Sequence, residues 1–426
     1  MLNTLLVSVY EGGYQPITLA SAARTIKDAG YPVTILDTYV EGVNEDKLRT
    51  PELVVISLPL FDAVHPGIEV ARRVRELNKD AHITFIGQHA TIHQSRLVGP
   101  YGDSAISGDW EEPLLQLIEQ LSGKTQHPVI PGLANENTLT LQGTVSPVIN
   151  RKHFKVPDRT VLPDLKKYPN LQINKLLGAE QVVGSTEMAR GCHHKCMYCS
   201  VYAAYDGKVG LIPLEVVVED VQNLMKMGMT HLTFIDADWF NAKHHGIQIL
   251  RELHSRFPSL TYDITTRVDH ILENEHLIPE LETLGVRIIT SALEFPKEDI
   301  LRIFNKEITM EQTEQALRVM QKSGIKLNPT FIMYNPWIDV SDLSLFHEWI
   351  KKVGLEDIVD PIQFETRLSI YKGSPLLQTR EVQQMQLEEH EFHYTWKHQD
   401  PWVDELYQAS LTPLEDGVFK RCCLKC

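Results

Sequence analysis

Cysteine placement is the feature that most constrains this chain. The six cysteines lie in two runs of three, with none elsewhere: Cys192, Cys196 and Cys199 in the middle, and Cys422, Cys423 and Cys426 at the end. Thiolates are ligands for soft and borderline metals. The two runs therefore predict two separate inorganic binding events. Clustered thiols also favour a reducing cytoplasm, where they stay available to metals.

Length and charge narrow the class of protein. A chain of 426 residues predicts two or three domains, and 43% hydrophobic residues allow large cores. The formal net charge of −15 argues against a nucleic acid as the main partner, because phosphate binding needs a basic face. The longest apolar run, near 53–61, contains Ser57 and Pro59, and the first residues lack signal-peptide features. We therefore expect no membrane span.

Residues 1–125 alternate short β-branched runs with amphipathic stretches. The expected strands are Leu5–Tyr10, Val33–Asp37, Val54–Leu58, Ile83–Ile86 and Ser104–Ile106. The clearest helical patterns are Thr18–Ala29, Ile68–Leu77 and Glu111–Leu121. This alternation predicts an α/β domain, Rossmann-like, with a parallel sheet covered on both faces. Residues 126–181 are rich in proline and are expected to form a linker, with a small hairpin around Leu139–Val145.

A second β/α series occupies residues 182–375. Its expected strands are Val182–Ala189, His231–Ile235, Tyr262–Arg267, Arg287–Leu293, Lys326–Met333 and Ile362–Ile370. The helical patterns between them are Leu214–Met227, Gly246–Phe257, Glu275–Leu284, Met310–Ser323 and Leu343–Val353. Six such units predict a partial (β/α)6 barrel, whose functional residues should follow the C-terminal ends of the strands. Residues 376–426 form a C-terminal extension that ends in the second cysteine run.

The central run, Cys192-x-x-x-Cys196-x-x-Cys199, follows the first strand of the second series. Three thiolates can bind three irons of a [4Fe–4S] cluster and leave the fourth iron open. A bidentate ligand such as an amino acid can then coordinate that iron. The alternative is a zinc knuckle in which His193 or His194 supplies the fourth ligand.

The segment from Met188 to Ser200, with Tyr198 as the aromatic residue before the last cysteine, resembles the radical S-adenosylmethionine (SAM) superfamily. The resemblance covers about residues 182–375. It implies that SAM chelates the open iron through its amino and carboxylate groups. It also implies that an electron, supplied by a reductant or electron-donor protein, breaks a carbon–sulfur bond of SAM homolytically.

Several strand ends resemble the positions that hold SAM in this superfamily. Asp236 and Asp238 would meet the methionyl ammonium, although carboxylates at this place also serve as helix N-caps. Arg267 would pair the SAM carboxylate, with an ion pair to Asp269 as the alternative. Glu294 would lie near the ribose, and its alternative role is that of a buried glutamate whose hydrogen bonds are satisfied.

Residues 1–125 resemble the cobalamin-binding-like domain that precedes the barrel in many radical SAM enzymes. The segments that carry this resemblance are Phe85–Thr91 and Ser107–Pro113. The Asp-x-His-x-x-Gly motif that supplies the lower ligand of cobalamin is absent, since Asp62–Gly67 has the residue types with a different spacing. Cobalamin binding stays open, against a domain that only caps the barrel.

The terminal run, Arg421–Cys426, has several interpretations. The residues alone allow a vicinal disulfide, a nonfunctional tail, or ligands for a second iron–sulfur cluster. Adjacent Cys422 and Cys423 do not easily reach separate irons. A compact trio of thiolates that includes Cys426 suits a three-coordinate thiophilic centre such as trivalent arsenic.

The last six residues resemble the tail of the RCCLKC-tail radical SAM proteins, a family that includes enzymes of arsinothricin biosynthesis. This resemblance implies that SAM and arsenite are the substrates. A 3-amino-3-carboxypropyl radical from SAM would add to arsenic held by the catalytic residues Cys422, Cys423 and Cys426, giving hydroxyarsinothricin and methylthioadenosine. Two alternatives stay open: a cobalamin-dependent radical SAM methyltransferase, and a metal-sensing or arsenic-binding protein without catalysis.

Overall fold

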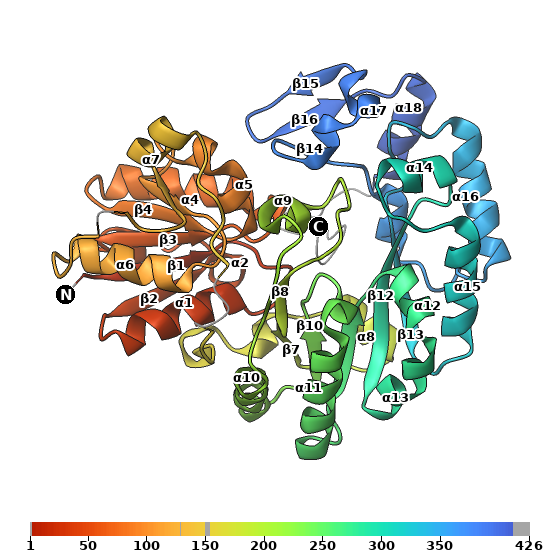
Figure 1. Ribbon diagram of the computed structural model, residues 1–426, viewed down its shortest axis with the longest axis horizontal. Coiled ribbons are helices and arrows are strands. Elements are labelled where there is room, and N and C mark those ends of the chain that lie inside the picture. The colour runs from red at the N-terminus through yellow and green to blue at the C-terminus, as the bar shows by residue number, and fades with distance from the viewer. Residues whose placement is uncertain (1, 128, 150–153, 412–426) are drawn as a thin grey trace. The chain divides into compact units, whose positions relative to one another are not determined.

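The computed structural model describes residues 2–127, 129–149 and 154–411. The chain divides into two compact units. Unit 1 comprises residues 1–193 and 200–235, and unit 2 comprises residues 194–199 and 236–426. Figure 1 shows the order of the elements along the chain. The predicted arsenic ligands Cys422, Cys423 and Cys426 lie outside the described residues.

The first sheet of unit 1 contains six strands. They are β1 (Thr4–Ser8), β2 (Val33–Asp37), β3 (Leu53–Ser57), β4 (His82–Ile86), β5 (Ser104–Ile106) and β6 (Leu133–Asn135). The strand order is β2-β1-β3-β4-β5-β6, in which only β6 is antiparallel to its neighbour. Strands β1 and β3 are buried along their whole length, as expected for a parallel sheet with helices on both faces. The predicted Rossmann-like sheet is confirmed.

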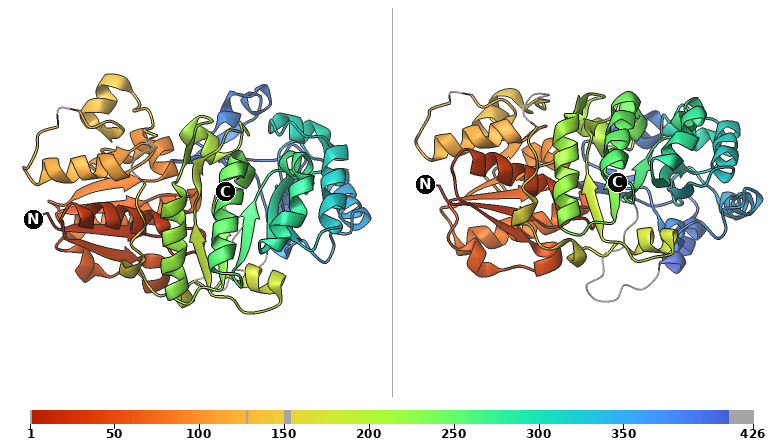
Figure 2. Two further views of the ribbon diagram at one scale, coloured as in Figure 1. Left: turned by 60° about the horizontal axis from the view of Figure 1, so that its bottom comes forward. Right: turned by 90° about the horizontal axis from the view of Figure 1, so that it is seen from below.

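Helices cover this sheet on both sides, as the views in Figures 1 and 2 show. They are α1 (Ile17–Asp28), α2 (Thr38–Glu41), α3 (Glu45–Leu48), α4 (Val64–Leu77), α5 (Gln88–Leu97) and α6 (Glu111–Leu121). Apolar residues recur on one face of α1, α4 and α6, and these faces supply the core. The alternation of the sequence therefore located these helices to within a few residues.

The hairpin expected around Leu139–Val145 is wrong, because helix α7 (Glu136–Gln142) occupies this place. The side chain of Asn135 accepts a hydrogen bond from the Thr138 backbone N–H at 2.9 Å. The Thr138 hydroxyl accepts in return from the Asn135 N–H at 2.8 Å, which completes a capping box. This box satisfies the first free N–H groups and outweighs the β-branched character of the segment.

The segment that was expected as a linker is fixed to unit 1 by Arg159. This residue lies in the short 3-10 helix η2 (Arg159–Val161), and its side chain is only 1% exposed. Its guanidinium pairs with both oxygens of Asp220 at 2.9 Å and donates to the Ser185 carbonyl at 2.7 Å. The same segment contains η3 (Leu165–Lys167) and α8 (Leu171–Leu177).

The second β/α series contains parallel strands in both units. In unit 1, β7 (Val183–Thr186) pairs in parallel with β10 (His231–Phe234). In unit 2, the strand order is β13-β12-β11, and β11 (Thr261–Thr265), β12 (Val286–Glu294) and β13 (Lys326–Phe331) are parallel. Helices of this series include α10 (Leu214–Lys226), α11 (Lys243–Arg256), α12 (Val268–Glu273), α13 (Ile278–Thr283), α15 (Met310–Gln321) and α16 (Val340–Lys352). The second parallel α/β region is thus confirmed.

The sixth strand expected at Ile362–Ile370 is wrong. Residues Pro361–Glu365 form the 3-10 helix η6, and only Ile370–Tyr371 (β14) is a strand, in a separate antiparallel sheet. The side chains of Gln363 and Thr366 accept hydrogen bonds from the backbone N–H groups of Phe331 and Met333, each at 2.8 Å. Side-chain oxygens therefore replace part of the ladder that a sixth strand would have made, and an isolated parallel bridge between Tyr334 and Arg367 is what remains of it.

The remaining elements are short. They are β8 (Ala189–Gly191), α9 (Ser200–Tyr205), β9 (Val209–Leu211), η1 (Phe61–Ala63), η4 (Trp239–Ala242), η5 (Glu275–Leu277), α14 (Glu298–Ile303), η7 (Pro375–Gln378), α17 (Arg380–Gln383), β15 (Leu387–Glu389), β16 (His393–Trp396) and α18 (Pro401–Ser410). Among the described residues, none of the helices combines the length and the apolar character that a membrane crossing requires.

Candidate functional site

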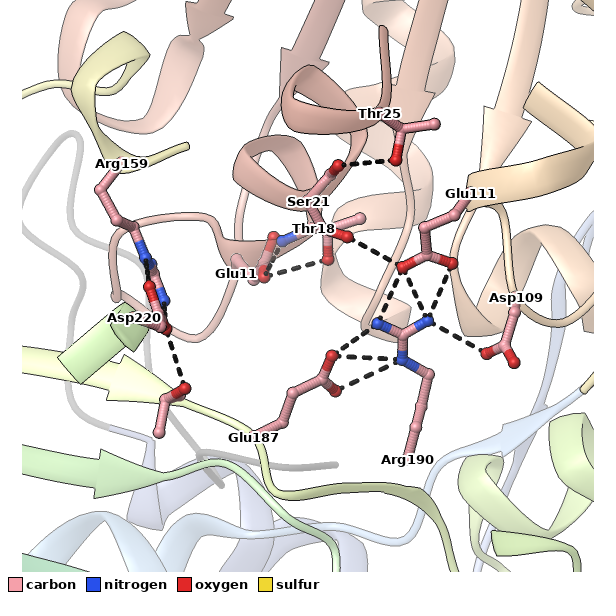
Figure 3. Close-up of polar contacts among 11 residues, drawn as sticks. Glu11, Thr18, Ser21, Thr25, Asp109, Glu111, Arg159, Glu187, Arg190 and Asp220 are labelled. Atoms are coloured by element: carbon pink, nitrogen blue, oxygen red, sulfur yellow. Dashed lines mark hydrogen bonds and ion pairs between the residues drawn. The ribbon is translucent and has the colours of Figure 1, made fainter. Parts of the chain in front are cut away.

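The strand that leads into the central cysteine run is held by a buried arginine. Arg190 lies on β8, and its guanidinium contacts Glu187 at 2.6 Å, Asp109 at 3.0 Å and Glu111 at 3.2 Å (Figure 3). The Ser21 hydroxyl of α1 donates to Glu111 at 2.8 Å. Strand β8 therefore meets the start of α6 at this side chain, and α1 is joined to the cluster through Glu111.

The Arg190 cluster has an unusual charge balance, because three carboxylates face one guanidinium. The Trp110 ring lies 4.0 Å from the guanidinium carbon, and the Phe154 ring lies 5.0 Å from it. Burial by itself would lower the pKa of Arg190, but the three carboxylates outweigh it and raise the pKa well above its usual range. The arginine is therefore permanently charged and is the cation that stabilises this buried acidic group.

The residues on either side of Cys192 continue this rigid connection. Gly191 has φ of +98°, and a Cβ atom added there would lie 2.1 Å from the Lys208 carbonyl oxygen. Only glycine fits this close approach, which the pairing of β8 with β9 imposes. A ring nitrogen of His193, Nδ1, lies 3.2 Å from the Gly207 carbonyl oxygen. Cys192 lies between these two fixed residues and is buried.

The remainder of the cysteine loop belongs to unit 2, where backbone hydrogen bonds hold it. The Met197 N–H donates to the Phe304 carbonyl at 3.0 Å, and the Leu376 N–H donates to the Met197 carbonyl at 3.0 Å. The side-chain amide of Asn305 donates to the Lys195 carbonyl at 3.1 Å. Cys196 is buried and Cys199 is half-buried. Thiols at this spacing suit the donor set of an iron–sulfur cluster.

Arg267 lies beside this loop. Its Nη1 donates to the Cys196 Sγ at 3.2 Å, and its other nitrogens pair with both carboxylate oxygens of Asp269 at 2.9 and 2.8 Å. A further hydrogen bond goes to the Lys306 carbonyl. Burial would lower the pKa of Arg267, but Asp269 and Cys196 raise it above its usual range. The alternative ion pair with Asp269 is therefore present, and it aims the guanidinium at a thiol.

Glu294 ends β12 in a strained conformation. Its φ is +62°, which is rare for a residue with a side chain, and the strand register shifts just before it. The carboxylate is buried, lies 2.7 Å from the Lys306 ammonium, and accepts a hydrogen bond from the Tyr198 hydroxyl. Burial and the Glu294 charge raise the pKa of Tyr198. A half-buried hydroxyl donor, a buried carboxylate and a buried ammonium are thus connected beside the cysteine loop.

Asp236 and Asp238 follow β10, as expected, and both are buried. Asp238 caps η4, since its Oδ1 accepts a hydrogen bond from the Phe240 N–H at 3.2 Å. The Asp238 Oδ2 lies close to His194 and His270. Burial would raise the pKa of the Asp238 carboxyl, but its contacts with the two histidines outweigh it and hold the pKa below its usual range.

Four of the residues that sequence reasoning selected in unit 2 contact one another or the cysteine loop. Asp238 lies 3.3 Å from His194 of that loop. Tyr198 meets Glu294, and Arg267 meets Cys196. Sequence reasoning assigned no role to Lys306, Arg190 or His270. Arg190 was within the segment from Met188 to Ser200 that carries the superfamily resemblance, so it had a signal. A single histidine on a short helix such as α12 has none.

Comparison with known proteins agrees with this geometry. Residues 186–349 match the profile of the Radical SAM superfamily. Hopanoid C-3 methylase of Methylococcus capsulatus is 23% identical over 348 residues, which are 80% of this chain and 64% of that protein. The anaerobic magnesium-protoporphyrin IX monomethyl ester cyclase of Rubrivivax gelatinosus is 26% identical over 342 residues, which are 76% of this chain and 59% of that protein. The chain thus spans less than two thirds of both relatives.

Two solved structures share the fold. The radical SAM methyltransferase TsrM from Kitasatospora setae, with tryptophan and a SAM analogue bound, has a TM-score of 0.71 at 18% identity, over 88% of this chain and 75% of that chain. The cobalamin-dependent radical SAM enzyme OxsB, with aqua-cobalamin bound, has a TM-score of 0.74 at 15% identity, over 96% of this chain and 66% of that chain. By these comparisons, residues 186–349 are similar to the Radical SAM superfamily.

Proposed function

We propose that this protein is a radical SAM transferase, which cleaves SAM reductively and passes one of its carbon groups to an acceptor. The observation that carries this proposal is the group of polar side chains beside the cysteine loop in unit 2. Arg267 contacts Cys196, while Glu294, strained and buried, binds Lys306 and Tyr198. Strained residues and buried, oppositely charged pairs of this kind concentrate at functional sites.

The three central cysteines would hold a [4Fe–4S] cluster, which supplies the electron that breaks a carbon–sulfur bond of bound SAM. Arg267 places a permanent positive charge beside the Cys196 sulfur, to which its guanidinium donates a hydrogen bond. Glu294 has the carboxylate needed to bind hydroxyl or ammonium groups of SAM, and its partner is the Lys306 ammonium, 2.7 Å away. Asp236 stays our predicted contact of the SAM ammonium.

The finer proposal that the comparisons favour is methyl transfer with cobalamin. TsrM is described as a methyltransferase with a cobalamin-bound structure, and OxsB as cobalamin-dependent. The β2-β1-β3-β4-β5 order of unit 1 has its topological switch between β1 and β3, where the loops of such sheets form a binding crevice. These observations support cobalamin binding, and they outweigh the absence of the lower-ligand motif.

A second candidate is favoured by the sequence Arg421–Cys426. In this alternative the 3-amino-3-carboxypropyl group of SAM moves to trivalent arsenic bound by Cys422, Cys423 and Cys426. The products would be hydroxyarsinothricin and methylthioadenosine. Its support lies in the three neighbouring thiolates, which match the preference of arsenic for sulfur. Arsenite, an electron-donor protein and a cytoplasmic location belong to the same set of predictions.

One anaerobic experiment separates these candidates. The reconstituted protein is incubated with SAM and dithionite, with or without hydroxocobalamin and arsenite, and the fragments of SAM are identified by mass spectrometry. S-adenosylhomocysteine together with a corrinoid visible spectrum would support methyl transfer. Methylthioadenosine with an arsenical, lost in Cys426→Ser, would support aminocarboxypropyl transfer. Protein with a full complement of iron that leaves SAM intact would refute the transferase proposal itself.

A further inference from the structure

Three potential metal ligands converge in unit 2, apart from the cysteines. His194 belongs to the cysteine loop, Asp238 follows β10, and His270 lies on α12. One ligand atom from each residue lies within 4.8 Å of the other two. The Asp238 Oδ2 is 3.3 Å from the His194 Nε2 and 2.7 Å from the His270 Nδ1.

The two oxygens of Asp238 have different environments. Oδ1 accepts hydrogen bonds from the Thr266 hydroxyl at 2.8 Å and from the Phe240 N–H at 3.2 Å. Oδ2 is buried, as are the His194 Nε2 and the His270 Nδ1, and none of these three atoms makes a hydrogen bond of good geometry. The surrounding donors therefore fix the carboxylate through one oxygen and leave the other for the two imidazoles. Metal-binding carboxylates are commonly oriented in this way by hydrogen bonds from neighbouring residues.

Ring packing restrains the two histidines as well. The His194 and His270 rings meet edge to face with centroids 4.8 Å apart, and Phe240 packs edge-on against His270 at 6.3 Å. A single aspartate–histidine hydrogen bond would explain one of the imidazole contacts. It does not explain why two imidazoles from different segments face the same carboxylate oxygen.

The distances between these ligand atoms suit a first-row transition metal. Zinc binds imidazole nitrogen and carboxylate oxygen at about 2.0–2.2 Å, so two ligand atoms in a tetrahedral site lie roughly 3.3 Å apart. The contact of Asp238 with His194 has this separation, at 3.3 Å. The contact with His270, at 2.7 Å, would open by about half an ångström on metal binding. Imidazole and carboxylate together suit zinc, iron(II) and cobalt(II).

We propose that the His194 Nε2, the Asp238 Oδ2 and the His270 Nδ1 bind one divalent first-row transition metal, such as zinc. Three protein ligands leave a coordination position for water or a substrate atom. This site goes beyond the proposed function, which requires metal only at the cysteines. Asp238 is then a metal ligand, and the predicted contact with the SAM ammonium falls to Asp236 alone.

The test uses zinc and the full-length, anaerobically reconstituted protein. We expect about one zinc per chain to remain after equilibrium dialysis, in addition to the cluster iron. Zinc-edge X-ray absorption should show a first shell of nitrogen and oxygen near 2.0–2.1 Å with imidazole scattering. Zinc on the cysteine loop or the terminal cysteines would instead show sulfur near 2.3 Å. A sulfur-only shell in the unsubstituted protein would overturn the proposal without any variant.

Matched variants assign the ligands. His270→Gln should weaken zinc binding at least tenfold while iron content is retained, because one of the three ligands is lost. His276→Gln is the control, since His276 is an exposed histidine six residues further along and should leave zinc binding unchanged. Zinc affinity that is equal in both variants would refute the assignment. SAM cleavage is measured separately, so failure of the metal site and failure of the transferase proposal remain distinguishable.

Discussion

Replacing Arg190 with methionine tests whether the buried cluster around β8 depends on its one cation. Methionine keeps much of the side-chain volume but leaves the carboxylates of Asp109, Glu111 and Glu187 without a positive partner. These carboxylates lie within 3.2 Å of the guanidinium, and their side chains are at most 15% exposed. Removing one partner of a buried ion pair costs about 3–5 kcal/mol, because the remaining charge stays out of water. We expect Arg190→Met to lower the free energy of unfolding by this amount.

Urea denaturation followed by circular dichroism measures the effect. With an m-value of about 3 kcal/mol/M, the expected loss lowers the midpoint of the affected transition by roughly 1–1.7 M. Arg49→Met is the matched control, since the Arg49 side chain is 51% exposed and pairs loosely with Glu45 at 3.4 Å. Exposed pairs of this kind contribute about 1 kcal/mol or less.

A double variant separates electrostatics from packing. Adding Glu187→Gln to Arg190→Met removes one unpaired charge and should recover part of the lost stability. The iron content after reconstitution should follow the same order, since β8 leads directly into Cys192. A midpoint change for Arg190→Met no larger than that for Arg49→Met would refute the reasoning. So would a double variant that is less stable than the single one.

Three further predictions concern other parts of the chain. Burial raises the pKa of Glu11 to about 7. The neutral form of this side chain therefore stabilises the fold by roughly 3 kcal/mol below about pH 4.5, and this contribution is lost as the pH rises through 7. Glu11→Gln should therefore flatten the dependence of the melting temperature on pH, and an unchanged slope would contradict this assignment. Gly191→Ala should lower stability and iron content, because its Cβ would meet a backbone oxygen at 2.1 Å, whereas Gly228→Ala, also at positive φ but with open space around it, should keep its iron. Lys306→Met should weaken SAM binding at least tenfold in equilibrium dialysis with iron retained, because it leaves the Glu294 carboxylate buried without its cation; undiminished binding would exclude Glu294 from the SAM site.

Much of the fold could be predicted from local patterns. Strands β2 and β5 and helix α6 have the expected bounds, because buried β-branched runs and amphipathic periodicity are properties of a few neighbouring residues. The predicted strands at α7 and η6 were wrong. At both places, side-chain oxygens accept hydrogen bonds from backbone N–H groups. Such replacement depends on which segment lies alongside, and a periodicity analysis does not contain that information.

The sequence by itself determined which thiol side chains the central loop offers to a metal, because the three cysteines lie within eight consecutive residues. It also determined the two parallel α/β regions, since hydrophobic periodicity is local. Only the tertiary structure decided which charges are paired. Arg190 meets Asp109 and Glu111 from 81 and 79 residues away, and Lys306 meets Glu294 across the end of β12. A buried charge is tolerated only beside its partner, and the partner is set by the packing of distant segments.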